Sequence, residues 1–179
     1  MTVERLPDMN VPRNGHSMHV INGEPTVFGG HSTGYIPTAT AEYYSKGRWH
    51  LVDMVYPHDL GAALQLPTGQ VFLFGGCEFP VDVGQSYFVE RYDPISHQFS
   101  PLPIMDRKRA RPSAVLLSDG TFVVSGNWKN EDGIAFWSPA SGGERYKEAS
   151  APRMNPHILP VDSSDAIIFG SRSNRSEER

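Results

Sequence analysis

The stretch Gly69-Gln70-Val71-Phe72-Leu73-Phe74-Gly75-Gly76 decides the fold, because the chain contains four versions of it. A turn residue starts each version, a largely apolar run follows, and a glycine stands six residues after the turn. The other versions are residues 23–30, 120–127 and 164–171. The four turn positions lie, in chain order, 46, 51 and 44 residues apart. Periods of about 20 to 50 residues are typical of repeat arrays and propellers.

Each version predicts a β-hairpin. Asn22-Gly23 and Asp119-Gly120 are two-residue turns in which both positions can adopt a positive φ. The runs beside the turns are rich in Val, Phe, Leu and Ile, which favour strands. Residues 71–74 and 115–117 are continuously apolar, which is typical of strands buried on both faces. No segment has the 3.6-residue period of a helix, so we expect an all-β protein of antiparallel sheets packed face to face.

The paired glycines indicate how closely those sheets pack. A strand that ends against a neighbouring sheet has no room for a Cβ atom, and its exit needs a positive φ. Asn127 replaces the second glycine in the third version, and asparagine also tolerates the left-handed region. Ser171 in the fourth version fits this pattern less well.

Strand, turn, strand and Gly-Gly, followed by spaced Tyr and Trp residues, resembles the kelch repeat. The best copies are residues 13–49 and 59–99, and residues 89–94 resemble the third strand of a kelch repeat. Residues 6–9 and 102–105 resemble the linkers that lead into a repeat. The resemblance implies an incomplete kelch-like β-propeller of four-stranded antiparallel blades, covering residues 1–171.

The implied repeats span about residues 10–55, 56–105 and 106–150, with a partial repeat at 151–171 and a polar, charged tail at 172–179. Propellers have typically about 4–8 blades, so three and a half repeats do not close an ordinary ring. Three explanations remain open. The chain is a fragment of a longer propeller, or two chains share one ring as a homodimer, or the ring is small and distorted.

The resemblance also implies a candidate ligand face. In kelch propellers the linkers and the loops after Gly-Gly share one face at the channel mouth. The residues implied for this face are Arg13, Asn14, His31, Ser32, Glu78, Arg109, Arg111, Asn127, Trp128 and Arg153. A ring of guanidinium groups would bind a carboxylate-bearing ligand, such as an acidic sugar or an acidic peptide. The alternative is that these arginines bind backbone carbonyls between blades.

The leading functional hypothesis is a non-catalytic module that binds a protein or an acidic glycan through these loops. The alternative is a sugar-active enzyme resembling a sialic acid mutarotase, with Glu78 and His31 or an arginine as its acid–base pair. Some kelch-like enzymes carry copper and a Tyr–Cys cross-link. Cys77 follows Gly75-Gly76, but no motif assembles the other ligands of such a site, and we expect no cofactor.

Composition excludes several other classes. The net charge of -4 argues against a nucleic-acid partner, and Arg107–Arg111 is expected to be a solvated loop. No run of about 18 apolar residues exists, so no membrane partner is expected. One cysteine and seven scattered histidines give no metal site. No G-x-S-x-G elbow, P-loop or G-x-G-x-x-G occurs. The first twenty residues lack an apolar signal segment, which makes the cytoplasm the default expectation.

Overall fold

The computed structural model describes residues 3–78, 84–126, 133–139, 143–148, 153–161 and 165–172, and within 143–148, 153–155 and 171–172 it describes the backbone only. Every regular element in these residues is a β-strand, and no helix occurs among them. The predicted all-β class is therefore confirmed. The candidate residues Asn127 and Trp128 lie outside the described residues.

In the described residues, three four-stranded sheets and a final two-stranded sheet follow one another along the chain, and a second two-stranded sheet is inserted within the first. The first sheet contains β1 (Ser17–Ile21), β2 (Glu24–Phe28), β5 (Thr40–Ser45) and β6 (Arg48–Asp53). The second contains β7 (Ala62–Gln65), β8 (Val71–Phe74), β9 (Val89–Asp93) and β10 (Gln98–Leu102). The third contains β11 (Ser113–Leu116), β12 (Phe122–Ser125), β13 (Gly133–Ser138) and β14 (Gly143–Glu148). The last contains β15 (Arg153–Pro160) and β16 (Ala166–Arg172).

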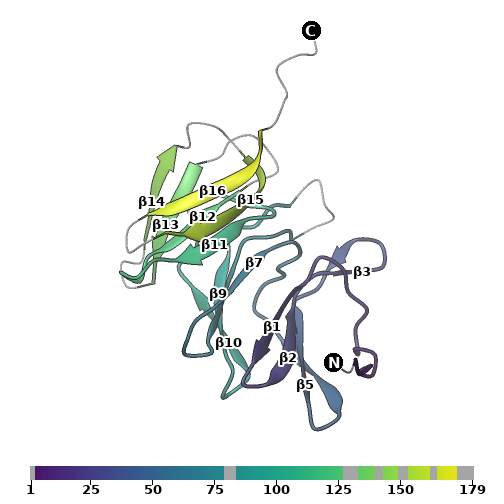
Figure 1. Ribbon diagram of the computed structural model, residues 1–179. Helices are drawn as coiled ribbons and strands as arrows, with labels where there is room; N and C mark the ends of the chain where they lie inside the picture. The colour runs from purple at the N-terminus through teal and green to yellow at the C-terminus, as the bar shows by residue number, and fades with distance from the viewer. Residues whose placement is uncertain are drawn as a thin grey trace.

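All neighbouring strands pair antiparallel and in chain order, so each sheet is a simple meander. A short hairpin of β3 (His31–Ser32) and β4 (Ile36–Pro37) interrupts the first meander between β2 and β5. Figure 1 shows the sheets as a row, from β1 and β2 in purple, through β7 and β9, to β15 and β16 at the far end. The first strands contact one another along this row, β1 with β7, β7 with β11, and β11 with β15.

The second sheet is buried on both faces, as its continuous apolar run predicts. Val71 and Leu73 pack with the first sheet, where they join a core that includes Phe28. Phe72 and Phe74 point the opposite way and pack with Phe122 of the third sheet. All four residues of β8 are buried, and so are all four of β12. The free energy of folding in this part of the chain therefore comes largely from face-to-face packing of consecutive sheets.

The paired glycines lie where one sheet meets the linker that enters the next. Gly29 and Gly75 have φ values of 62° and 59°. A Cβ atom at Gly29 would lie 2.6 Å from the carbonyl oxygen of His58, and one at Gly75 would lie 2.5 Å from that of Arg109. The amide of Gly76 donates to this same Arg109 oxygen at 2.7 Å. The predicted close approach at the double glycines is confirmed at both places.

A chain of backbone hydrogen bonds joins the segments that lead into the first strands. The amide of Leu60 donates to the carbonyl of Gly15 at 2.9 Å, and the amide of Arg111 donates to the carbonyl of Leu60 at 3.0 Å. All three residues have a positive φ, at 68°, 56° and 50° in chain order. These bonds hold the linkers of three consecutive sheets against one another, and the candidate site is built on them.

Candidate functional site

A shallow pocket of about 380 Å³ opens beside the β3–β4 hairpin. Its lining comes from the segment before β1 and from the hairpin, and consists of Pro12, Arg13, Asn14, His31, Ser32, Thr33, Gly34 and Tyr35. Two backbone hydrogen bonds between Asn14 and His31, at 2.9 and 2.8 Å, hold the two segments together. The structure thus brings Asn14, His31 and Ser32 of the sequence-predicted face to one place.

Tyr35 lies at the tip of the hairpin in a conformation that a tyrosine rarely adopts. Its φ is 58°, which costs an L-residue with a side chain about 1–2 kcal/mol. Its amide donates to the carbonyl of Ser32 at 3.2 Å, which closes the tight turn. Tyr35 as a whole residue is 59% exposed, and its ring centroid lies 5.1 Å from that of the His31 imidazole. The hairpin therefore presents an aromatic surface beside a histidine at the mouth of the pocket.

A buried carboxylate in the linker that leads into the second sheet orients His31. The Oδ1 atom of Asp59 lies 2.8 Å from Nδ1 of His31, and the side chain of Asp59 is fully buried. Because Nδ1 is held by Asp59, the other ring nitrogen, Nε2, is the one left for a ligand. Burial raises the pKa of Asp59, although hydrogen bonding with His31 and the charge of Arg111 act in the opposite direction.

Cys77 pairs with Asp59 in an isolated β-bridge. Its amide donates to the carbonyl of Asp59 at 2.7 Å, and the residue is buried. Burial and the nearby Asp59 charge raise the pKa of the Cys77 thiol to about 11. The thiol is therefore protonated at neutral pH and is a poor nucleophile and metal ligand in this state.

Arg13 lies inside the fold, although it also borders the pocket. Its guanidinium is fully buried, binds Glu42 at 2.8 Å, and donates to the carbonyls of Gly29 and Thr40, each at 2.8 Å. Burial alone would raise the pKa of Glu42, but hydrogen bonds from Arg13, Asn10 and the Val11 amide hold it below the usual value. Arg13 therefore stabilises the first sheet through carbonyls and a carboxylate of its own chain.

Arg109 has the same kind of role in the third sheet. It is buried, and its guanidinium donates to the carbonyl of Gly133 at 3.1 Å. Gly133 starts β13 as Thr40 starts β5, so Arg109 and Arg13 bind equivalent carbonyls. These contacts favour the alternative that the two arginines bind backbone carbonyls inside the fold, and their role in binding a ligand stays a prediction.

The other predicted residues are spread more widely. Arg111 is half-buried and lies close enough to Asp59 to affect its pKa. Glu78 is half-buried, and its amide donates to the carbonyl of Gly84 at 2.7 Å. Arg153 begins β15, where only the backbone is described.

Two residues of the site escaped the sequence analysis. Asp59 sits in a linker next to His58, and only the packing of the second linker on the first sheet brings it to His31. Tyr35 was not among the predicted residues, although the glycine before it, Gly34, is a turn signal. In the structure Asp59 bridges Cys77 as Asn14 bridges His31, an equivalence that the 46-residue step between the first two turns does not show.

No family model and no curated protein sequence matches this chain. The described residues contain no helix long and apolar enough to cross a membrane. Within the same residues, no group of three or more His, Cys, Asp or Glu side chains is placed to hold a metal ion.

Proposed function

We propose that the sheets are blades of a kelch-like β-propeller and that the chain is a binding module. Three features support the propeller. Each complete sheet is a four-stranded antiparallel meander, consecutive sheets pack face to face, and their first strands contact one another in sequence. A four-stranded meander repeated in this way is the unit from which propellers are built.

The ligand surface that we propose is the pocket at the β3–β4 hairpin, and the ligand is a glycan. The observation that carries this proposal is the exposed Tyr35 ring, held beside the pocket at a φ of 58°. Backbone strain of this kind clusters at functional sites. An aromatic ring can pack on the apolar face of a sugar, and Asn14, Ser32 and Thr33 supply an amide and two hydroxyls for its polar groups. Because Arg13 and Arg109 bind inside the fold, this ligand does not need an acidic group.

A glycan array probed with the purified chain tests the proposal, with affinities of the bound glycans then measured by calorimetry. Replacing Tyr35 with Ala should weaken binding at least tenfold, and Asn14→Ala should also weaken it. Ile36→Ala is the matched control, because Ile36 is exposed on the same hairpin but does not line the pocket. An array without bound glycans, or equal losses for Tyr35→Ala and Ile36→Ala, would refute glycan binding at this pocket.

The second candidate function is acid–base catalysis on a sugar, and the His31–Asp59 pair favours it. A buried carboxylate bound to Nδ1 fixes the imidazole and leaves Nε2 to accept or donate a proton, as in many catalytic histidines. The sequence analysis paired His31 with Glu78, whereas the structure pairs it with Asp59. Anomer exchange of free N-acetylneuraminic acid, followed by NMR, separates the two functions. A binding module leaves the spontaneous rate unchanged, whereas an enzyme raises it and loses the effect in His31→Gln.

A further inference from the structure

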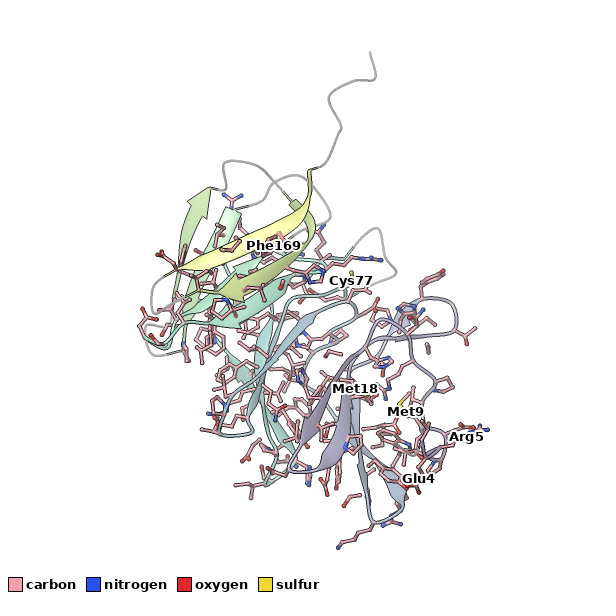
Figure 2. All side chains as sticks on the ribbon, viewed as in Figure 1. Glu4, Arg5, Met9, Met18, Cys77 and Phe169 are labelled. Carbon is pink, nitrogen blue, oxygen red and sulfur yellow. The ribbon has the colours of Figure 1, made fainter. Side chains whose placement is uncertain are left out.

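The row of sheets has an exposed face at each end. The residues of these two faces stand at the same repeat positions as residues that are buried between sheets inside the row. The end face consists of Leu159 on β15 with Ile167 and Phe169 on β16. The start face consists of Met18 and Val20 on β1, with Met9 in the segment before it. Figure 2 labels Met9 and Met18 at the first sheet and Phe169 at the opposite end of the row.

The strand register shows that Phe169 of the end face is equivalent to Phe28 and Phe74, which are buried between sheets. Phe28 pairs with Ser17 and Phe74 with Ala62, at the start of the first strand of each sheet. Both phenylalanines are fully buried against the sheet that follows. Phe169 stands at the same step of its repeat, five residues after the turn position and directly before the glycine. It is nevertheless 50% exposed, because no sheet covers it among the described residues.

Leu159 and Ile167 extend the end face beyond Phe169. They are direct cross-strand partners, and both are exposed, as is Phe169 two residues further along β16. Residues two apart in a strand point to the same side. Ile158 and Ile168 point the other way and pack with the third sheet. The two-stranded sheet therefore has one covered apolar face and one open apolar face.

The residues of the start face are equivalent to residues that pack against the preceding sheet inside the row. Met54 stands four residues before His58 and packs between the first and second sheets. Met105 stands four residues before Arg109 and packs between the second and third sheets. Met9 stands four residues before Arg13, at the position of these core methionines.

On β1, Met18 is 63% exposed and Val20 is 62% exposed. Met18 pairs with Val27, as Ala63 pairs with Leu73 and Ala114 with Val124. In the second and third sheets, Ala63 and Ala114 both pack against the sheet that comes before. The start face is thus the side of the first sheet that would receive a preceding sheet.

We propose that the end face of one chain packs on the start face of a second copy of the same chain, and that this contact continues the row of sheets across two molecules. Inside the row, each face equivalent to the end face packs on the next sheet, on the side equivalent to the start face. A second copy of the chain supplies such a start face, so the second copy is the occupant. Both faces are apolar, so the contact excludes water as the internal ones do. If the second molecule's end face also reaches the first molecule's start face, two chains close one ring.

The experiment measures solution mass by light scattering on a size-exclusion column, over a range of concentrations. The wild-type chain should form a species of twice 19.9 kDa. Phe169→Asp and Met18→Asp should each reduce it to 19.9 kDa, because each removes one of the two complementary faces. Ile95→Asp is the control, because Ile95 is 88% exposed in the β9–β10 turn, which is part of neither face.

An equimolar mixture of the two monomeric variants distinguishes this contact from others. Phe169→Asp keeps a start face and Met18→Asp keeps an end face, so the mixture should again form a species of two chains. Larger species that both variants abolish would also support the contact, since a head-to-tail interface that does not close forms filaments. A wild-type monomer at every concentration overturns the proposal, and so does a Met18→Asp dimer, in which end faces pair with each other. Ile167→Asp and Val20→Asp are the second pair, used if circular dichroism shows that either first variant is unfolded.

Discussion

Arg13 and His58 occupy the same position in consecutive repeats and bind equivalent partners. Arg13 donates to the carbonyl of Gly29 and binds Glu42, whereas His58 Nδ1 lies 2.6 Å from the carbonyl oxygen of Gly75 and its Nε2 lies 3.2 Å from Glu90. All four of these side chains are buried. The fold therefore requires a nitrogen-bearing side chain between a glycine carbonyl and a glutamate at the entrance of each of these two sheets.

Removing the cation from the first of these pairs should destabilise the protein strongly. Arg13→Met leaves Glu42 buried without a counter-charge, and breaking a buried pair in this way costs about 3–5 kcal/mol. The free energy of unfolding, measured in urea, should fall by that amount. The double variant Arg13→Met, Glu42→Leu should be more stable than the single one, because it no longer buries an uncompensated charge. Arg5→Met is the control, since Arg5 pairs with Asp8 at the exposed surface and should contribute nothing measurable.

Alanine at the glycines should separate close packing from backbone strain. Gly120 has a φ of 84° and nothing within 4 Å of an added Cβ atom, so Gly120→Ala should cost only about 1–2 kcal/mol of strain. Gly75→Ala has the same kind of strain and also a contact of 2.5 Å with the carbonyl oxygen of Arg109. Its urea midpoint should fall at least twice as far as that of Gly120→Ala. Equal shifts would mean that the linker at Arg109 moves away without loss.

Two aspartates should respond to pH in opposite directions. Burial raises the pKa of Asp59, so the folded state binds its proton more tightly than the unfolded state does. The stability of wild type relative to Asp59→Asn should therefore be greatest below the ordinary carboxyl pKa of about 4 and should fall as the pH rises through the raised pKa. Urea unfolding at pH values from about 2 to 7, which extend below and above the ordinary carboxyl pKa, measures this difference.

Asp93 is the matched comparison for that experiment. Hydrogen bonds from the amide of Ile95 and the hydroxyl of Ser96 lower its pKa in an exposed turn. Wild type should therefore be more stable than Asp93→Asn above the ordinary carboxyl pKa, and this difference in the free energy of unfolding should disappear as the pH falls through the lowered pKa of Asp93. A pH dependence of the same sign for both aspartates would contradict the assigned environment of Asp59.

The sequence predicted what depends on neighbouring residues and missed what depends on the contact between sheets. Val71–Phe74 indicated a strand buried on both faces, because alternate side chains point to opposite sides and all four are apolar. No local pattern marks Leu60 for a positive φ, since leucine disfavours it and only the bonded linkers impose it. The contact of His31 with Asp59 spans 28 residues and joins two sheets. The arginines suggested a ligand because their side-chain chemistry suits both a carboxylate and a carbonyl, and only the geometry distinguishes the two.

The last prediction compares two phenylalanines at the same repeat position. Phe74 is fully buried between the second and third sheets, and Phe74→Ala should cost about 3–5 kcal/mol at any protein concentration. Phe169 is half-exposed, so Phe169→Ala should cost far less in dilute solution, where the chain is monomeric. Its cost should grow with concentration, because a second copy that covers Phe169 stabilises the folded chain by mass action. Thermal unfolding at several concentrations measures this. A large loss that is the same at every concentration would mean that Phe169 is covered within its own chain.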